Sequence, residues 1–261
     1  MTGNYIGYIM KMYRFNFNNM GSELITIGRA SKMLGVSIQT LRRWDDAGKL
    51  SSIRKAAAGH RYYRKEDIEN YNIKDLFKLA RRWIAGDLGS EPRQSFYCPD
   101  SSVFQARLSR LEYELGKIKE LSGTFPLITA IAGEIGNNSF DHNLGNWPDI
   151  PGIFFAYDLN KKIVVLADRG QGILKTLKRV MPNLKNHQEA LYVAFTKIIS
   201  GRRPESRGNG LKFVKEVVMN NKMSLFFQTG NAYLKIKNKE PDLKVQKAVV
   251  NFRGCLALIK F

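Results

Sequence analysis

Two short helical patterns separated by one glycine constrain the fold of the N-terminal part of this chain. The first predicts a helix over residues 24–35, in which apolar residues recur at intervals of three and four: Ile27, Ala30, Met33 and Leu34. Gly35 interrupts that pattern, and Ser37 is placed to cap a second helix over residues 38–47. Helix, glycine-centred turn and helix are together typical of a helix-turn-helix.

A short basic loop follows the second helix, and we expect it to form a wing. It runs from Arg54 to Arg64, has Gly59 at its tip and leads into a further helix near Asp67. A recognition helix lays its N-terminal residues on base edges, so polar and arginine side chains are needed there. The residues expected to contact DNA come from this helix and the wing: Ser37, Gln39, Thr40, Arg42, Arg43, Arg54, His60, Arg61, Tyr63 and Arg64. The alternative is a protein-binding module with a solvated basic face.

The composition agrees with a polyanionic partner. The 261 residues include 42 Lys and Arg against 23 Asp and Glu, a net charge of +19, and neutralising phosphates releases counterions. Hydrophobic residues make up 44% of the chain, which argues against disorder. The two cysteines, Cys98 and Cys255, exclude a disulfide scaffold and favour a reduced, cytoplasmic location. No apolar run reaches roughly 18 residues, so no membrane span is expected.

The N-terminal motifs resemble a known DNA-binding family. The segment ITIGRASKMLGVSIQTLRRWDDAGKL, followed by GHRYYRKEDIENY, is similar to the MerR-type and excisionase-like winged helix-turn-helix. The resemblance implies that the second helix enters the major groove of double-stranded DNA and that the wing contacts the backbone. It also implies a homodimer, because members of this family often pair through a helix that follows the domain.

One segment has the spacing of such a dimer helix. Apolar residues recur there at intervals of four and three over about two heptads: Phe104, Leu108, Leu111, Leu115 and Ile118. The alternative is a single amphipathic helix that packs on its own domain. Residues 86–101, which contain two glycines and two prolines, are expected to form a linker before it.

From residue 127 onward the apolar pattern predicts a mixed α/β domain. Helices are expected over 127–142, 188–199 and 209–221. Strands are expected over 152–158, 162–167, 223–228, 232–237 and 255–260. A tight turn at Asn160 and Lys161 is expected to join the first two strands as a hairpin.

Polar patches in this domain have the chemistry of a nucleotide site. The first, GEIGNNSFDHN, places Glu134 and Asn138 on one side of a helix, because they are four residues apart. An asparagine carbonyl suits Mg²⁺, and a glutamate one turn away is able to polarise a nucleophile. The second patch, ADRGQG, follows an apolar strand, and Asp168 is able to accept an adenine amino hydrogen. Its glycines permit close backbone approach to a ligand: Gly170 and Gly172.

A third patch, SRGNGLKF, is a loop that runs into a helix. Backbone amides at a helix N-terminus favour phosphate, and nearby arginines add positive charge: Arg202, Arg203 and Arg207. In this order the three patches resemble the N box and the two glycine boxes of the GHKL superfamily, whose members share the Bergerat ATP-binding fold. The final segment, NFRGCLALIKF, looks like a degraded last box, with Cys255 where a threonine is usual.

The GHKL resemblance assigns roles to single residues. By it, Glu134 is the catalytic residue, Asn138 holds Mg²⁺ and Asp168 binds adenine. The ATP-binding residues that it implies are Asn138, Asp141, Asp168, Gly170, Gly172, Arg207, Gly208, Gly210 and Leu211. The alternatives are a turn carboxylate for Asp168, a solvent-facing carboxylate for Glu134 and a solvated basic face for the arginines. A histidine kinase is not expected, because residues 104–121 contain no histidine.

The sequence therefore predicts an α+β chain of two domains, a small mainly-α winged helix-turn-helix and an α/β-sandwich Bergerat ATP-binding domain. The expected division is an arm over 1–23, a DNA-binding domain over 24–72, linker and connecting or dimerisation helices over 73–126, and an ATP-binding domain over 127–261. The favoured function is a DNA-binding regulator in which MgATP modulates DNA binding. The alternative is an ATPase or protein serine kinase tethered to DNA, with a protein substrate or regulatory partner.

Overall fold

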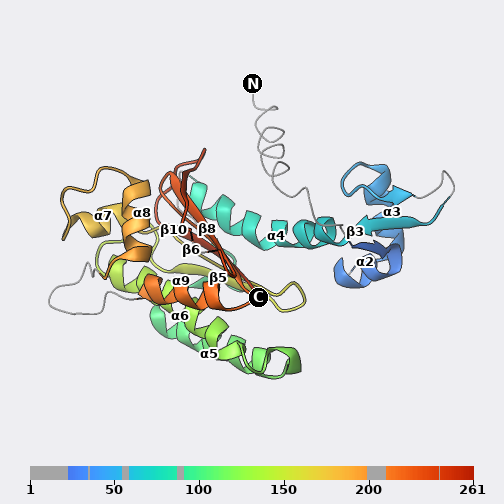
Figure 1. Ribbon diagram of the computed structural model, residues 1–261, viewed down its shortest axis with the longest axis horizontal. Helices are drawn as coiled ribbons and strands as arrows, with labels where there is room; N and C mark the ends of the chain where they lie inside the picture. Colours follow the sequence, from blue (N-terminus) through green and yellow to red (C-terminus); the bar gives the residue numbers. More distant parts are fainter. Residues whose placement is uncertain (1–22, 35, 55–58, 87–90, 199–209, 241) are drawn as a thin grey trace. The chain divides into compact units, whose positions relative to one another are not determined.

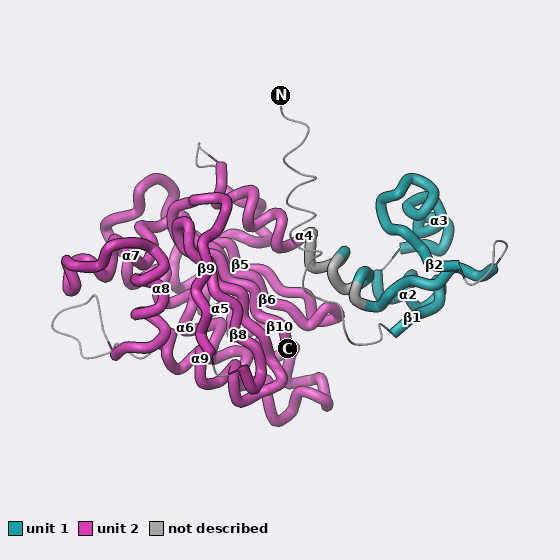
Figure 2. The backbone as a smooth tube through the Cα atoms, turned by 45° about the horizontal axis from the view of Figure 1, so that its top comes forward, with its two compact units in different colours: residues 1–72 teal, residues 73–261 magenta. Residues whose placement is uncertain are grey.

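The computed structural model describes residues 23–34, 36–54, 59–86, 91–198, 210–240 and 242–261 (Figure 1). The chain divides into two compact units, residues 1–72 and residues 73–261 (Figure 2). Within the described residues there are eight α-helices and two β-sheets. Residues 1–22 of the expected arm over 1–23, and the predicted site residues Arg207 and Gly208, lie outside the described part of the chain.

The first unit is a small helical domain with a three-stranded sheet. Its elements are β1 (Leu24–Thr26), α2 (Ile27–Leu34), α3 (Ile38–Asp46), β2 (Ile53–Arg54), β3 (Arg61–Arg64) and the start of α4 (Lys65–Ala85). Both β1 and β2 pair antiparallel with β3. The expected helix over 24–35 is therefore wrong in its first three residues. They form a strand because Ile25 pairs with Tyr63, a partner far along the chain.

The core of this unit comes from β1, α2, α3, β3, the start of α4 and the segment that follows α3. Its buried residues are Ile25, Ala30, Leu41, Leu50, Tyr63 and Ile68. The Ser37 hydroxyl accepts a hydrogen bond from the Thr40 amide at 3.1 Å and caps α3, as the sequence predicts. Leu41 is fully buried, so one face of α3 is fixed against the core and the other is left to solvent.

The second unit is built on one antiparallel sheet with the order β4-β5-β6-β10-β7-β8-β9. The strands are β4 (Tyr97–Cys98), β5 (Ile153–Asp158), β6 (Ile163–Asp168), β7 (Ser224–Thr229), β8 (Ala232–Lys237), β9 (Val245–Lys247) and β10 (Cys255–Lys260). The helices that follow α4 are α5 (Ser101–Gly116), α6 (Phe125–Asn143), α7 (Gly172–Lys178), α8 (His187–Thr196) and α9 (Gly210–Asn220), with a 3-10 turn at Lys119–Leu121.

Both faces of this sheet are covered by helices (Figure 1). On one face α6, α8 and α9 pack against side chains such as Phe155, Leu166 and Phe227. On the other face Ala80 and Ile84, in the C-terminal half of α4, pack against alternate strand residues. The strands are thus buried on both sides, which explains why the sequence of β6 is an unbroken apolar run.

The apolar residues of the predicted coiled-coil seam pack within the second unit. Phe104, Leu108, Leu111 and Leu115 of α5 are buried in the same core as α6. Contact is close at Gly136 of α6, where a Cβ would lie 2.1 Å from the Phe104 ring. These side chains are not available to a second copy, so they follow the alternative of packing on their own domain.

The longer strands of the second unit were predicted from the sequence, and several short elements were not. The predicted strands match β5, β6, β7, β8 and β10 to within a residue, and β5 and β6 form the predicted hairpin. The sequence did not predict β4, β9 or α7, which have two, three and seven residues. Among the helices that the structure describes, none combines the length and apolar character needed to cross a membrane.

Candidate functional sites

A buried carboxylate stands at the end of β6. Asp168 is 2% exposed, and its Oδ2 accepts a hydrogen bond of 2.8 Å from the Ser139 hydroxyl of α6. Its Oδ1 accepts a bond of 2.8 Å from the Gly170 amide. Burial raises the pKa of Asp168 to about 6, although the bonds from Gly170, Ser139 and Cys255 oppose that shift. The sequence predicted Asp168 but missed Ser139, which lies within the same patch as Glu134.

A second bond from α6 fixes the turn after Asp168. The Asn143 side-chain oxygen accepts a hydrogen bond of 2.7 Å from the Gln171 amide, and its nitrogen donates to the Ser139 carbonyl. A Cβ on Gly170 would lie 2.0 Å from the Asn143 side chain. Close packing against α6 therefore requires glycine at this position.

Two more glycines and a threonine complete this corner. Gly172 and Gly254 have φ values of +74° and +71°, which favour glycine. A Cβ on Gly172 would lie 3.0 Å from Thr229 Oγ1, and that hydroxyl donates to the Gly254 carbonyl at 2.9 Å. Burial and the Asp168 carboxylate raise the pKa of the Cys255 thiol well above its usual value. The ends of β6, β7 and β10 thus meet at one polar, glycine-lined corner.

The predicted pair on α6 lies beside the start of α9. A Cβ on Gly210 would lie 2.4 Å from Glu134 Oε2 and 3.3 Å from Asn138 Nδ2. Glu134 and Asn138 are both partly exposed. The structure therefore brings Glu134, Asn138 and Gly210 together, one residue along α6 from Ser139, which bonds Asp168.

The remaining predicted nucleotide residues are placed differently. Leu211 is half-buried against the core of the unit. Asp141 is exposed near the end of α6.

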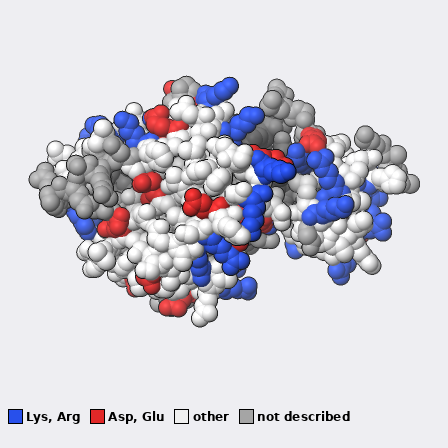
Figure 3. Space-filling view, turned by 90° about the horizontal axis from the view of Figure 1, so that it is seen from below, with Lys and Arg blue, Asp and Glu red and all other residues white. Residues whose placement is uncertain are grey.

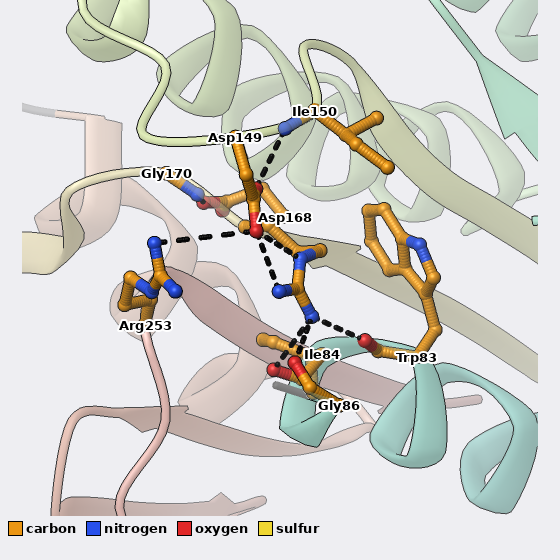
Figure 4. A network of polar contacts seen from close by, with 9 residues as sticks. Trp83, Ile84, Gly86, Asp149, Ile150, Asp168, Gly170 and Arg253 are labelled. Carbon is orange, nitrogen blue, oxygen red and sulfur yellow. Dashed lines mark hydrogen bonds and ion pairs between the residues drawn. The ribbon is translucent and has the colours of Figure 1, made fainter. Parts of the chain in front are cut away.

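An unpredicted arginine lies between Asp168 and Gly170 in the chain. The Arg169 side chain is 2% exposed, and its Nε and Nη2 donate to Asp149 Oδ2 at 2.9 and 2.5 Å. Its Nη1 donates to three carbonyls at the end of α4, those of Trp83, Ile84 and Gly86, at 2.6, 3.3 and 2.8 Å (Figure 4). Burial opposes the charge of Asp149, but the Arg169 hydrogen bond lowers the pKa of that carboxyl.

The first unit contains α3, the helix that the sequence predicts to contact DNA. On α3 the side chains of Gln39, Arg42 and Arg43 are exposed, and Thr40 is partly exposed. Ser37 and Thr40 share a hydrogen bond of 2.9 Å between their hydroxyls at the start of the helix. Figure 3 shows Lys and Arg side chains gathered on the face of this unit that is turned to the viewer. Gln39, Arg42 and Arg43 therefore have the exposure that contact with base edges requires.

Two wing residues have structural contacts instead. Tyr63 is fully buried, and its hydroxyl donates to the Leu41 carbonyl, so its expected role in contacting DNA is corrected to a core position. Arg61 donates to Asp45 at 2.7 Å and to Asp46 at 2.9 Å. Burial opposes the charge of Asp45, but bonds from Arg61 and Ser52 lower its pKa to about 2.

The other wing residues remain at the surface. Arg54 lies 3.7 Å from Asp45 and is partly exposed. His60, just before β3, and Arg64, the last residue of β3, are exposed. Among the described wing residues that the sequence predicts to contact DNA, Arg54, His60 and Arg64 therefore lie at the surface.

Comparisons with known proteins found a curated relative and a matching family model. The Type II methyltransferase M.Eco47II of Escherichia coli is 45% identical to this chain over 61 residues, which are 23% of the chain. The chain spans only 15% of the length of that relative. The family model described as "MerR family regulatory protein" matches residues 26–63, which include α2, α3 and β2 and reach into β3. Residues 26–63 are therefore a MerR-family helix-turn-helix domain.

Proposed function

We propose that the chain is a DNA-binding regulator whose second unit binds MgATP at a GHKL-like site, and that the nucleotide modulates DNA binding. The proposal of nucleotide binding rests on the buried Asp168 carboxylate at the end of β6, which accepts a hydrogen bond from Ser139 of α6. The DNA half rests on the MerR-family match to residues 26–63.

Asp168 is suited to adenine. Ser139, Gly170 and Cys255 all bond the Asp168 carboxylate, so an amino hydrogen of the base would share an acceptor oxygen with these donors. A buried carboxyl favours a ligand that brings a matching donor, because a ligand without one gains no hydrogen bond from it. This arrangement supports a purine with an exocyclic amino group as the ligand.

The start of α9 is suited to phosphates. α9 has 11 residues, and its first amides are free of helical partners and favour anions. Asn138 and Glu134 lie beside Gly210 at this helix end and offer the oxygen donors that Mg²⁺ prefers. Bound Mg²⁺ would neutralise phosphate charge there, with Asn138 as its protein ligand.

In the first unit, α3 is proposed to enter the major groove of double-stranded DNA through Gln39, Arg42 and Arg43, with Arg64 of the wing on the backbone. A cytoplasmic location and a homodimer remain predictions from the sequence.

A second candidate function is an ATPase or protein serine kinase tethered to DNA. It is favoured by Glu134, whose carboxylate lies beside Gly210, where the phosphates are proposed to bind. A glutamate there is able to act as the base for water or a serine hydroxyl.

The deciding experiment is a titration of the full chain on DNA that flanks its gene, with and without MgATP, beside calorimetry of ATP binding. We expect ATP binding that Asp168→Ala abolishes and a DNA affinity that changes with MgATP. Equal DNA affinity in both conditions would refute the modulation. A ligand shifts the equilibrium between two conformations only if it binds one of them more tightly. Retained ATP binding in the variant would refute the adenine site.

A further inference from the structure

We infer that Arg169 is a positioning residue that ties the nucleotide turn to the C-terminal end of α4, so that α4 responds to nucleotide. The inference rests on the proposed function, since it names the route by which that site is linked to the rest of the chain. Arg169 stands between Asp168 and Gly170, whose backbone and side-chain groups bond one another. A displacement of this turn on nucleotide binding therefore displaces Arg169.

The end of α4 depends on this arginine. The last carbonyls of a helix lack partners within it and carry partial negative charge, so a cation that bonds them is stabilising. Arg169 Nη1 bonds the carbonyls of Trp83, Ile84 and Gly86 from a position more than 80 residues later in the chain (Figure 4). The cap of α4 is thus supplied by the loop that carries the candidate adenine acceptor.

The guanidinium has little freedom to compensate for a movement of its backbone. Two of its nitrogens bond Asp149 Oδ2, and the third bonds the helix end. Its side chain is 2% exposed, so loss of these bonds would leave a buried charge poorly paired. The side chain and the backbone at Arg169 are consequently expected to move together.

α4 contributes to the core of each unit. Near its start, Ile68 is fully buried in the core of the first unit, and the Tyr71 ring lies 4.9 Å from the ring of Trp44 of α3. Near its end, Ala80 and Ile84 are buried against the sheet of the second unit. A change at the capped end of α4 therefore occurs in the helix that supports α3, the proposed recognition helix.

Linkage makes the coupling measurable in both directions. If nucleotide favours one arrangement of Arg169 and α4, DNA that favours the same arrangement must bind more tightly with nucleotide present. We expect MgATP to change hydrogen exchange in residues 80–86 of the full chain. We also expect the ratio of DNA affinities with and without MgATP to differ from one.

The test compares Arg169→Lys with Arg253→Lys. Lysine keeps the charge at position 169 but lacks the planar fork that bonds Asp149 and the helix end together. Arg253 also lies near Asp149, at 4.0 Å, but its side chain is 53% exposed, which makes it a matched control. We expect Arg169→Lys to bind ATP and DNA separately while its affinity ratio falls to about one, and Arg253→Lys to keep the wild-type ratio.

The outcomes separate the two levels of the proposal. No ATP binding by the wild-type chain in calorimetry would overturn the proposed function, and this inference with it. ATP binding without altered exchange in residues 80–86 would overturn the inference alone, and this measurement needs no variant. An unchanged affinity ratio in a folded Arg169→Lys protein would also overturn it.

Discussion

The hydroxyl of Ser139 donates a 2.8 Å hydrogen bond to the carboxylate of Asp168 and joins α6 to the end of β6. This bond links the two halves of the candidate nucleotide site, because the neighbouring residue on α6, Asn138, lies beside the start of α9. It also helps to hold charge on a carboxyl that is 2% exposed. The protonation state of Asp168 is therefore the property on which ligand binding should depend.

Nucleotide affinity is expected to fall in mild acid. The pKa of Asp168 is about 6, so the folded protein protonates this carboxyl as the pH drops below that value. A protonated carboxyl is a weaker acceptor for an adenine amino group, so affinity should fall by about tenfold for each pH unit well below 6. Calorimetry of ATP binding between pH 5 and pH 8 measures this. An affinity that stays flat through pH 6 would contradict the role of Asp168.

Asp168→Asn should stabilise the protein without ligand. The pKa of Asp168 is raised from 3.8 to about 6, so the folded state is favoured when this group is protonated and loses stability as the pH rises through 6. The neutral amide avoids that loss, so the free energy of unfolding at pH 7 should rise by about 1–3 kcal/mol. Denaturant unfolding at pH 7 and pH 4 provides the check, because the gain should vanish at the lower pH. A loss of stability at pH 7 would show that the carboxylate is needed structurally.

Glu134→Gln should separate ATP turnover from ATP binding. The variant keeps the shape of the side chain but loses the base, so any hydrolysis should fall by roughly 100-fold or more while affinity is retained. Release of phosphate and calorimetry measure the two properties. Glu112→Gln is the matched control, because Glu112 is an exposed carboxylate on α5. Equal turnover in both variants would remove the chemical role of Glu134.

Arg42→Ala should weaken DNA binding without affecting the fold. Arg42 is exposed on α3, and a lost base contact should cost about 1–3 kcal/mol of binding and relax sequence preference. Titrations on specific and unrelated DNA at two salt concentrations distinguish a base contact from a phosphate contact. Lys178→Ala on α7 is the control for loss of one exposed positive charge. Equal effects of the two variants would argue against α3 as the recognition helix.

The sequence reveals the residue types of the candidate sites but not their long-range partners. Local signals were sufficient for the Ser37 cap of α3 and for Asp168 at the end of an apolar strand. Ser139 and Asn143 were missed because their partners lie 29 and 28 residues away. One signal was available, since these two residues are also four apart on the predicted helix.

Long sequence separation also explains why residues 24–26 were assigned to a helix and why Arg169 was missed. Residues 24–26 were assigned to a helix because their strand partner, β3, lies beyond the whole helix-turn-helix. No role for Arg169 was predicted from the sequence, because the carbonyls that it bonds are 83 to 86 residues earlier in the chain. A single arginine that follows an apolar strand gives no indication in sequence of which helix it caps.

Arg61→Ala should destabilise the first unit, whereas substitution of an exposed arginine such as Arg42 should not. Its partner Asp45 has a pKa lowered from 3.8 to about 2, so this interaction stabilises the fold above pH 4 and is lost as the pH falls toward 2. Because solvent screens this shallow site, we expect a small loss of stability at pH 7. Hydrogen exchange of α3 in the full chain measures it, with Arg42→Ala as the control that should show none. If Arg61→Ala instead weakened DNA binding and left exchange unchanged, Arg61 would be a phosphate contact and its ion pairs with Asp45 and Asp46 would be incidental.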